Sequence, residues 1–405
     1  MSTFVVPRGS TSILPGCWAV CLLLTSALAV PGCASDPDDG IAVEWVVTDS
    51  AGIQDIELRA PSPLPAAVLN EDRLLVSVEQ PPGRFGEVID GALGPSGVYA
   101  LDRLAGQVFR FDLAGRYVTV VGKVGDGPGE LRWPHSLSLR SDTVYVLNRR
   151  RGRLLSYRPD GQAVREVAVG DLPHRAVPMR HGAVAILTRQ RTSSSSADPH
   201  RAVLRVGTFE IRAIDIRGTD NLLYETAGSE SVVLGTTWIG LPYQSTMLLR
   251  THPAGAVFGG DHRHDLVIVG PEGVERRFRW PEAREPLTDR EWDSLRDARL
   301  GSAAPGTGGF VEAQFIDEAR PERKPWVGGI ATDRTDGRIW VQAKGVSRTV
   351  LPRMYGFDLV RRTFVHVSLP ENSRLLAVDS SRVLLLRVGE LDEHSLEIYS
   401  VEGVR

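Results

Sequence analysis

The densest cluster of metal-type side chains in this 405-residue chain is the segment Asp261-His262-Arg263-His264-Asp265. On a strand, His262 and His264 would lie on one face and could bind zinc or copper, with Asp265 as a third candidate ligand. The segment comes directly before an apolar strand, however, where polar residues usually form a solvated turn. We therefore expect neither a metal nor a cofactor, and name His262, His264 and Asp265 as the candidates if a metal does bind.

A second candidate is the basic run Arg149-Arg150-Arg151-Gly152-Arg153, which could hold a phosphate or an acidic surface. A similar segment 46 residues upstream, Arg103-Leu104-Ala105-Gly106-Gln107, has the composition of an ordinary hairpin turn. This favours a solvated turn at both places. The sequence contains no G-x-S-x-G, no H-E-x-x-H and no phosphate-binding loop, so no catalytic residue is predicted.

The first 33 residues have the layout of an export signal, with one charge, an apolar stretch and small residues at its end. The sequence Val30-Pro31-Gly32-Cys33 resembles a bacterial lipobox, in which the cysteine is acylated and becomes the first mature residue. Cleavage after Ala27-Leu28-Ala29 and a buried N-terminal helix are the alternatives. We predict a signal peptide over 1–32, a lipid-anchor tether over 33–44, palmitate on Cys33, and a location in the bacterial cell envelope facing the periplasm or the exterior.

All three cysteines lie in this N-terminal region, at positions 17, 21 and 33, so the folded body cannot contain a disulfide. With 47 basic and 50 acidic residues, the chain has no positive excess and nucleic acid is not expected as a partner. The partners we predict are the membrane, through the lipid anchor, and an unknown protein or small molecule.

An internal repeat is the clearest structural signal. Segments 98–118 and 144–164 align without a gap, with identical residues at Val98/Val144, Tyr99/Tyr145 and Gly106/Gly152 among others. Each copy has the pattern strand, turn, strand, turn, strand, and weaker copies occur near 267–273, 338–359 and 383–403. A unit of this length in a chain with little helix predicts an all-β fold, a β-propeller of six or seven blades; a β-sandwich is the alternative. We expect Tyr99 and Tyr145 to be buried equivalently between sheets, and a strand from 43–48 or 53–58 to complete the last blade.

The segment Gly122–Leu131, followed by Trp133-Pro134, resembles the inter-blade signature of NHL-type propellers, and Val46–Ile53 resembles the start of six-bladed propeller lipoproteins of environmental bacteria. The resemblance covers 45–170 and 326–403 well and 171–260 poorly. It implies a six-bladed β-propeller over 45–405 and no defined activity. Lactonases and lyases on such propellers use Glu, Asn, Asp or His in the central channel, and Asp102 and Asn148 are the matching candidates here. Each is also explained as a turn residue bonded to its own backbone.

Residues 281–325 interrupt the repeat. Thr288-Asp289-Arg290-Glu291 forms a predicted capping box, with Leu287 and Trp292 as a hydrophobic staple, so a helix should run to about Leu300, followed by a flexible Gly/Ala/Pro stretch over 301–309. This short helical insertion is either a lid over one mouth of the ring or a surface loop pinned by Trp292.

These observations predict an envelope-anchored binding or scaffold protein of unknown ligand, with enzymatic activity not expected. A propeller hydrolase or lyase, lactonase-like with a channel metal, is the main alternative. A purely structural envelope protein is the third possibility.

Overall fold

The computed structural model describes residues 43–401, except 62–66, 70–72, 76–84, 172, 191–201, 216–217, 235–236, 242–246, 261–263, 318–319 and 345–351. The predicted signal peptide, Cys33 and His262 lie outside the described residues. No helix within the described part of the chain is long and apolar enough to cross a membrane.

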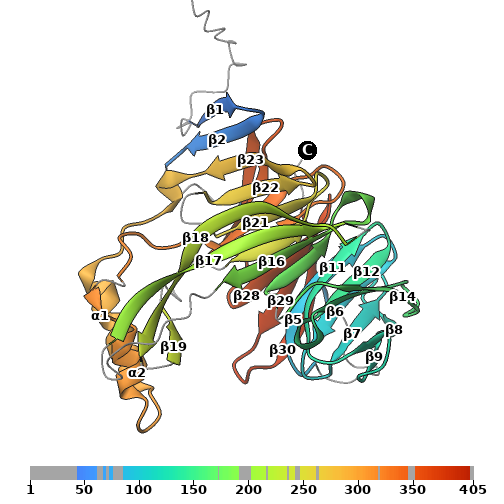
Figure 1. Ribbon diagram of the computed structural model, residues 1–405, viewed down its shortest axis with the longest axis horizontal. Helices are drawn as coiled ribbons and strands as arrows, with labels where there is room; N and C mark the ends of the chain where they lie inside the picture. The colour runs from blue at the N-terminus through green and yellow to red at the C-terminus, as the bar shows by residue number, and fades with distance from the viewer. Residues whose placement is uncertain are drawn as a thin grey trace, which may run out of the picture. The chain divides into compact units, whose positions relative to one another are not determined.

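The body is an all-β ring of six sheets, with its strands coloured in chain order in Figure 1. The first three blades are β5(Val88–Gly94)-β6(Gly97–Asp102)-β7(Gln107–Phe111)-β8(Tyr117–Val121), β11(Pro134–Arg140)-β12(Thr143–Asn148)-β13(Arg153–Tyr157)-β14(Ala163–Ala168), and β15(Arg175–Pro178)-β16(Val184–Gln190)-β17(Ala202–Ile214)-β18(Asp220–Leu234)-β19(Thr237–Gly240). The other three are β20(Leu248–Thr251)-β21(Ala256–Gly259)-β22(Leu266–Gly270)-β23(Gly273–Arg279), β24(Val327–Thr332)-β25(Ile339–Ala343)-β26(Arg353–Asp358)-β27(Thr363–Ser368), and β28(Ser373–Val378)-β29(Arg382–Val388)-β30(His394–Ser400).

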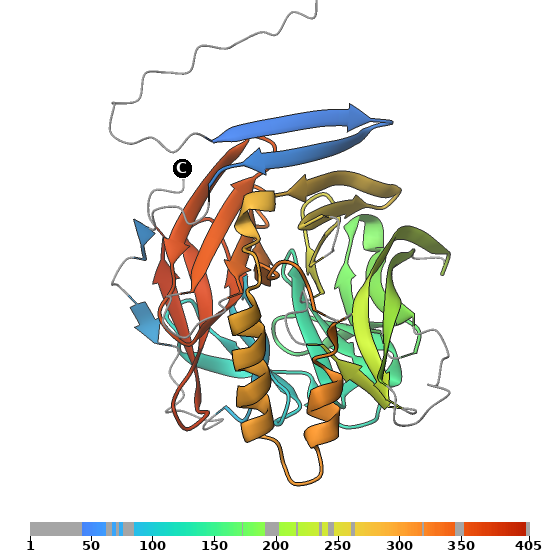
Figure 2. The ribbon, with the colours of Figure 1, turned by 90° about the vertical axis from the view of Figure 1, so that its left-hand side faces the viewer.

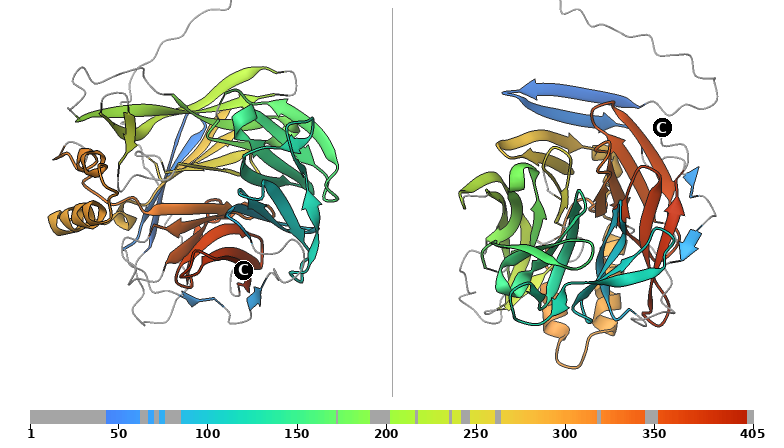
Figure 3. Two further views of the ribbon diagram at one scale, coloured as in Figure 1. Left: turned by 90° about the horizontal axis from the view of Figure 1, so that it is seen from below. Right: turned by 90° about the vertical axis from the view of Figure 1, so that its right-hand side faces the viewer.

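The inner strand of each blade contacts the inner strand of the next, from β5 through β11, β15, β20 and β24 to β28, and β28 returns to β5. These six strands surround the ring axis, along which Figure 2 and the right panel of Figure 3 look from opposite sides. The prediction of a six-bladed β-propeller is confirmed, and the β-sandwich alternative is excluded.

The ring is closed by an N-terminal strand, as expected, but not by the predicted segment. β4(Arg73–Leu75) pairs antiparallel with β30 and supplies the fourth strand of the last blade, with Leu74 opposite Ile398. The predicted strands are β1(Glu44–Ser50) and β2(Ile53–Arg59), and they form a hairpin that extends the fourth blade, where β2 lies parallel to β23. A further short strand, β3(Ala67–Val68), lies parallel to β27. The prediction that 43–48 or 53–58 completes the last blade is therefore wrong. Both of those strands find apolar partners in blade four, where Ile56 and Leu58 are buried against Phe278.

The two copies of the predicted repeat have the same strand register. β5 and β11 begin 46 residues apart, and each has a β-bulge at the same place, between Val88 and Asp90 and between Pro134 and Ser136. The glycine-rich signature forms a closed loop in which β9(Lys123–Val124) lies parallel to β10(Glu130–Leu131). Gly125 has a φ of +158°, a conformation that L side chains rarely adopt, so this position favours glycine.

The poorly matching region forms blade three, whose β17 and β18 are much longer than the other strands. It also contains a short 3-10 turn, η2(Arg180–Gly182), and a similar turn, η1(Arg149–Arg151), follows β12 in blade two. Lengthened strands hide the repeat period from a sequence comparison, which explains why the resemblance fades there.

The insertion contains η3(Pro281–Ala283), α1(Asp289–Gly301) and α2(Gly308–Ala313). The predicted capping box is confirmed, since the Thr288 hydroxyl accepts from the Glu291 amide at 3.3 Å and the Glu291 carboxylate accepts from the Thr288 amide at 3.1 Å. Leu287 and Trp292 pack together with Phe315 in a small core. The stretch predicted to be flexible contains the start of α2, because Val311 and Phe315 pack against the first helix and give this turn an apolar face.

The two repeat-equivalent tyrosines differ in burial, contrary to expectation. Tyr99 is fully buried and its hydroxyl lies 2.6 Å from the Ser96 hydroxyl, whereas Tyr145 stays partly exposed. Tyr99→Ala should destabilise the fold by about 3–5 kcal/mol, the usual cost of removing a buried ring. Tyr145→Ala should cost at most about 2 kcal/mol, because part of its ring is in water already. Urea unfolding of both variants measures this, and equal losses would contradict it.

Candidate functional site

The inner strands all run in the same direction, so the central channel has a first mouth, where these strands begin, and a second mouth, where they end. The insertion joins β23 to the start of β24 and therefore lies on the first-mouth side, nearest the viewer in Figure 2. The charged side chains on the inner strands include Asp90 on β5, Arg175 on β15, Arg250 on β20 and Arg374 on β28.

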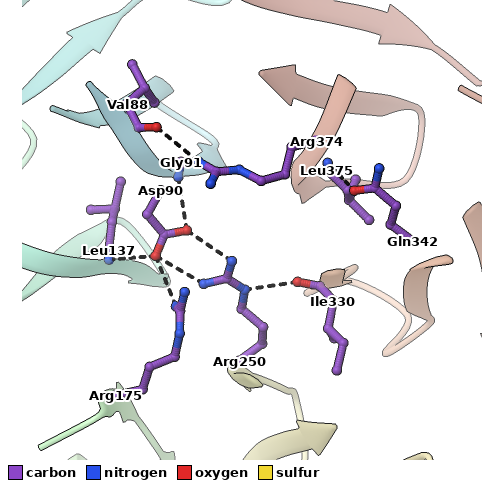
Figure 4. Close-up of polar contacts among 10 residues, drawn as sticks. All are labelled: Val88, Asp90, Gly91, Leu137, Arg175, Arg250, Ile330, Gln342, Arg374 and Leu375. Atoms are coloured by element: carbon purple, nitrogen blue, oxygen red, sulfur yellow. Dashed lines mark hydrogen bonds and ion pairs between the residues drawn. The ribbon is translucent and has the colours of Figure 1, made fainter. Parts of the chain in front are cut away.

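Asp90 on β5 is the centre of this group and is completely buried (Figure 4). Arg250 binds it through both terminal nitrogens, at 3.1 and 3.0 Å, and Arg175 donates to the same carboxylate at 3.1 Å. The backbone amides of Leu137 and Gly91 also donate, at 3.0 and 3.1 Å. A buried carboxylate needs such partners, and a two-pronged arginine contact is the strongest kind available.

The arginines reach the Asp90 group from different blades. Arg250 also donates to the Ile330 carbonyl at 2.9 Å, and Arg374 donates to the Val88 carbonyl at 3.0 Å. Gln342 joins blade five to blade six through two backbone groups, Ser373 and Leu375, both at 2.8 Å. These contacts connect all six blades at one level of the channel (Figure 4).

Burial alone would raise the pKa of Asp90, but the charges of Arg250 and Arg175 and the Leu137 hydrogen bond lower it to about 2. Burial and the neighbouring Arg250 lower the pKa of Arg175 to about 10, against the opposite effect of Asp90. Asp90 and Arg175 therefore stay charged at neutral pH, and their contact is an ion pair.

Two imidazoles lie on the first-mouth side of this network. The rings of His135, on β11, and His174, just before β15, are 6.4 Å apart between centroids. Burial, together with the charges of Arg149 and Arg175, lowers the pKa of each to about 4. Both are therefore neutral at pH 7, in a positive local field.

The second mouth is closed by Arg334, in the turn after β24. Its guanidinium donates to the Leu93 carbonyl and, at 3.3 Å, to the Ser141 carbonyl, which belong to blades one and two. Between Arg334 and Arg250 lies a cavity of about 50 Å³, whose lining includes Ser138 and Thr251. It is large enough for water but not for a metabolite. Within the described part of the chain, Arg334 thus narrows the channel at the second mouth.

The residues predicted from the sequence serve mainly structural roles. Asp265 is buried and accepts from the Trp280 amide at 2.6 Å and from Arg284 at 3.0 and 2.5 Å, so it holds the start of the insertion. His264 lies 3.4 Å from the Tyr224 hydroxyl. No group of three His, Cys, Asp or Glu side chains close enough to hold a metal occurs among the described residues.

Asp102 and Asn148 are both turn residues. The Asp102 carboxylate accepts from the amides of Gly86, Glu87 and Ala105, at 2.6, 3.1 and 2.9 Å. The side-chain amide of Asn148 donates to the Arg132 carbonyl and accepts from the Arg132 backbone N–H. Neither projects into the Asp90 network.

The sequence reasoning missed Asp90, Arg175, Arg250 and Arg374. One signal was available, because an aspartate inside the apolar stretch Val88–Leu93 needs a buried partner. The three arginines lie 85 to 284 residues further along the chain. Nothing in their local sequence marks them as its partners.

Comparisons with known proteins agree on the architecture. Residues 95–198 match the family model DUF5128, described as a 6-bladed beta-propeller. A search of curated proteins found no match. The chain is therefore a six-bladed β-propeller.

Among solved structures, a duf4221 family member from Bacteroides vulgatus is 10% identical, with a TM-score of 0.48 over 82% of this chain and 97% of that one. A putative exported protein from Bacteroides fragilis is 10% identical, with a TM-score of 0.41 over 90% and 98%. A gluconolactonase from Xanthomonas campestris is 11% identical, with a TM-score of 0.43 over 84% and 97%. Likenesses this distant carry no argument about activity.

The Asp90 network gives a direct stability prediction. Asp90→Asn leaves Arg175 and Arg250 buried without their counter-charge and should destabilise the fold by about 3–5 kcal/mol. Asp126→Asn is a matched control, because Asp126 pairs with Arg132 at the surface and its loss should cost less than about 1 kcal/mol. Chemical unfolding compares the two, and similar losses would show that the network does not stabilise the ring.

Proposed function

We propose that this protein is a lipid-anchored, extracytoplasmic binding protein that takes its ligand at the first mouth of the propeller channel. The observation that carries the binding site is the convergence of Asp90, Arg175, Arg250 and Arg374 from four blades at that mouth, while Arg334 blocks the other. Ligand sites are typically concave places where a few polar groups converge.

The geometry supports binding better than catalysis. Asp90, the buried acid of the network, has its carboxylate occupied by two arginines and two amides and a pKa of about 2. A general base is most effective with a pKa near the working pH, so this carboxylate is poorly suited to that role. The proposed location is supported by the export-signal layout of residues 1–33 and by Gly32-Cys33 at its end.

A steric variant tests the binding site without assuming a ligand charge. His135→Trp should fill the first mouth, so ligands found by thermal shift in a panel of neutral and acidic sugars, amino acids, lactones and phosphate should lose their stabilising effect. Arg334→Gln, at the second mouth, is the control and should retain it. Ligands unaffected by His135→Trp would place binding elsewhere, and lactone hydrolysis that depends on added Ca²⁺ would support the lactonase-like alternative instead.

The anchor is tested separately. Cys33→Ser should abolish metabolic labelling with palmitate and either release soluble protein or leave the precursor uncleaved, because acylation requires the thiol. Membrane fractionation and labelling measure this, with Cys21→Ser as the matched control that should label normally. Intact labelling of Cys33→Ser would contradict lipidation at this residue.

A further inference from the structure

The charges at the first mouth do not balance. Three arginines, Arg175, Arg250 and Arg374, face the single carboxylate of Asp90, so two positive charges are not neutralised within this group. The nearest other acid that acts on Arg374 is Glu87, and Glu87 is already paired with Arg103 at 2.6 Å. Arg374 itself is exposed to solvent, so its charge is accessible to a ligand.

Arg149 adds a third positive charge at the same place, and the repeat explains why the described part of the chain offers it no acidic partner. Arg103 and Arg149 are equivalent positions 46 residues apart, and Arg103 is held by Glu87 through two hydrogen bonds, at 2.8 and 2.7 Å. The position equivalent to Glu87 in the second blade is Trp133. Among the described residues, the buried Nε of Arg149 has no hydrogen-bond partner. Because blade two has Trp133 where blade one has Glu87, Arg149 has no such ion pair and lies beside His135 and His174.

Trp133 itself has features of a contact residue. Its side chain is 56% exposed, and its backbone has a φ of +60°, a conformation that is unfavourable for a bulky residue. Asn148 fixes the preceding Arg132 peptide from both sides, so the strained position is held by the fold. Pro134 pairs with Asn148, so Trp133 and Arg149 are neighbours at the end of this ladder. The exposed aromatic ring provides a flat surface on which a ligand ring can stack.

We propose that the first mouth binds a ring-bearing anion, a carboxylate or phosphate carried on a sugar-like ring, with the anionic group on Arg149, Arg175 and Arg374 and the ring on Trp133. This deepens the proposed function, on which it rests. The guanidinium fork matches carboxylate and phosphate geometry, and the neutral imidazoles of His135 and His174 are further hydrogen-bond donors.

Titration calorimetry of the propeller, residues 34–405, with galacturonate, galactose, glucose 6-phosphate, glucose and inorganic phosphate tests the proposal. We expect a Kd below about 1 mM for an acidic sugar and at least about tenfold weaker binding of its neutral counterpart. The affinity should fall as salt is added, because exposed charges are screened. Tight binding of galacturonate alone or of the phosphate ester alone identifies the anionic group, and inorganic phosphate binding as tightly as either sugar would overturn the stacking role of Trp133.

Two variants test the assigned residues with little risk to folding. Trp133→Glu recreates the acid of the first blade, should pair with Arg149, and should weaken acidic-sugar binding by about tenfold or more. Arg149→Gln should have a similar effect, whereas Arg116→Gln, which removes an exposed charge on the second-mouth side, should have none.

Outcomes that overturn the inference differ from those that overturn the proposed function. Binding of neutral ligands that His135→Trp blocks, together with no preference for anions, would leave the first mouth as a binding site and disprove the ligand class. Full affinity for anions in both Trp133→Glu and Arg149→Gln would also disprove it. Failure of every ligand in the broad panel to respond to His135→Trp would disprove the site itself.

Discussion

The ion pairs of one buried carboxylate hold the ring together. Asp90 accepts from blades one to four, its partner Arg250 continues to blade five, and Arg374 connects blade six back to blade one. Apart from such polar contacts, neighbouring blades of a propeller pack through apolar faces. Apolar packing alone does not fix where polar groups lie around the axis. A buried carboxylate needs hydrogen-bond or ionic partners for its oxygens. This requirement of Asp90 fixes the positions of the arginines and backbone groups around it. The shape of the channel follows from that requirement.

The architecture could be predicted because it depends on patterns among residues that are close in sequence. The 46-residue repeat, the capping box at Thr288 and the turns after Asp102 and Asp112 depend on neighbours in sequence, and all appear as expected. The closing strand could not be predicted this way. β4 is three residues long, and only its pairing with β30 distinguishes it from a loop, while the more strand-like β1 and β2 found apolar partners in another blade.

The site was less predictable than the fold for the same reason. Asp90 stands out in an apolar strand, but the arginines of its network come from three other blades and look like ordinary arginines in the sequence. The basic run at 149–153 was interpreted as one solvated turn, and the structure divides it. Arg151 bonds the Asp126 and Gly127 carbonyls, Arg153 pairs with Glu166 at 3.7 Å, and Arg149 lies close enough to His135 and His174 for its charge to act on both. A run of basic residues in a sequence does not show which of its side chains will lie near the channel in the folded protein.

The closing strand also has a consequence for how the protein reaches its folded state. Residues 73–75 leave the ribosome early, but their partner, β30, is made last, because it ends at Ser400. The ring can be completed only after nearly the whole chain is available, and contacts between such distant segments form slowly. Until then β4 lacks its partner β30, and the backbone polar groups that would pair the two strands are open to wrong partners.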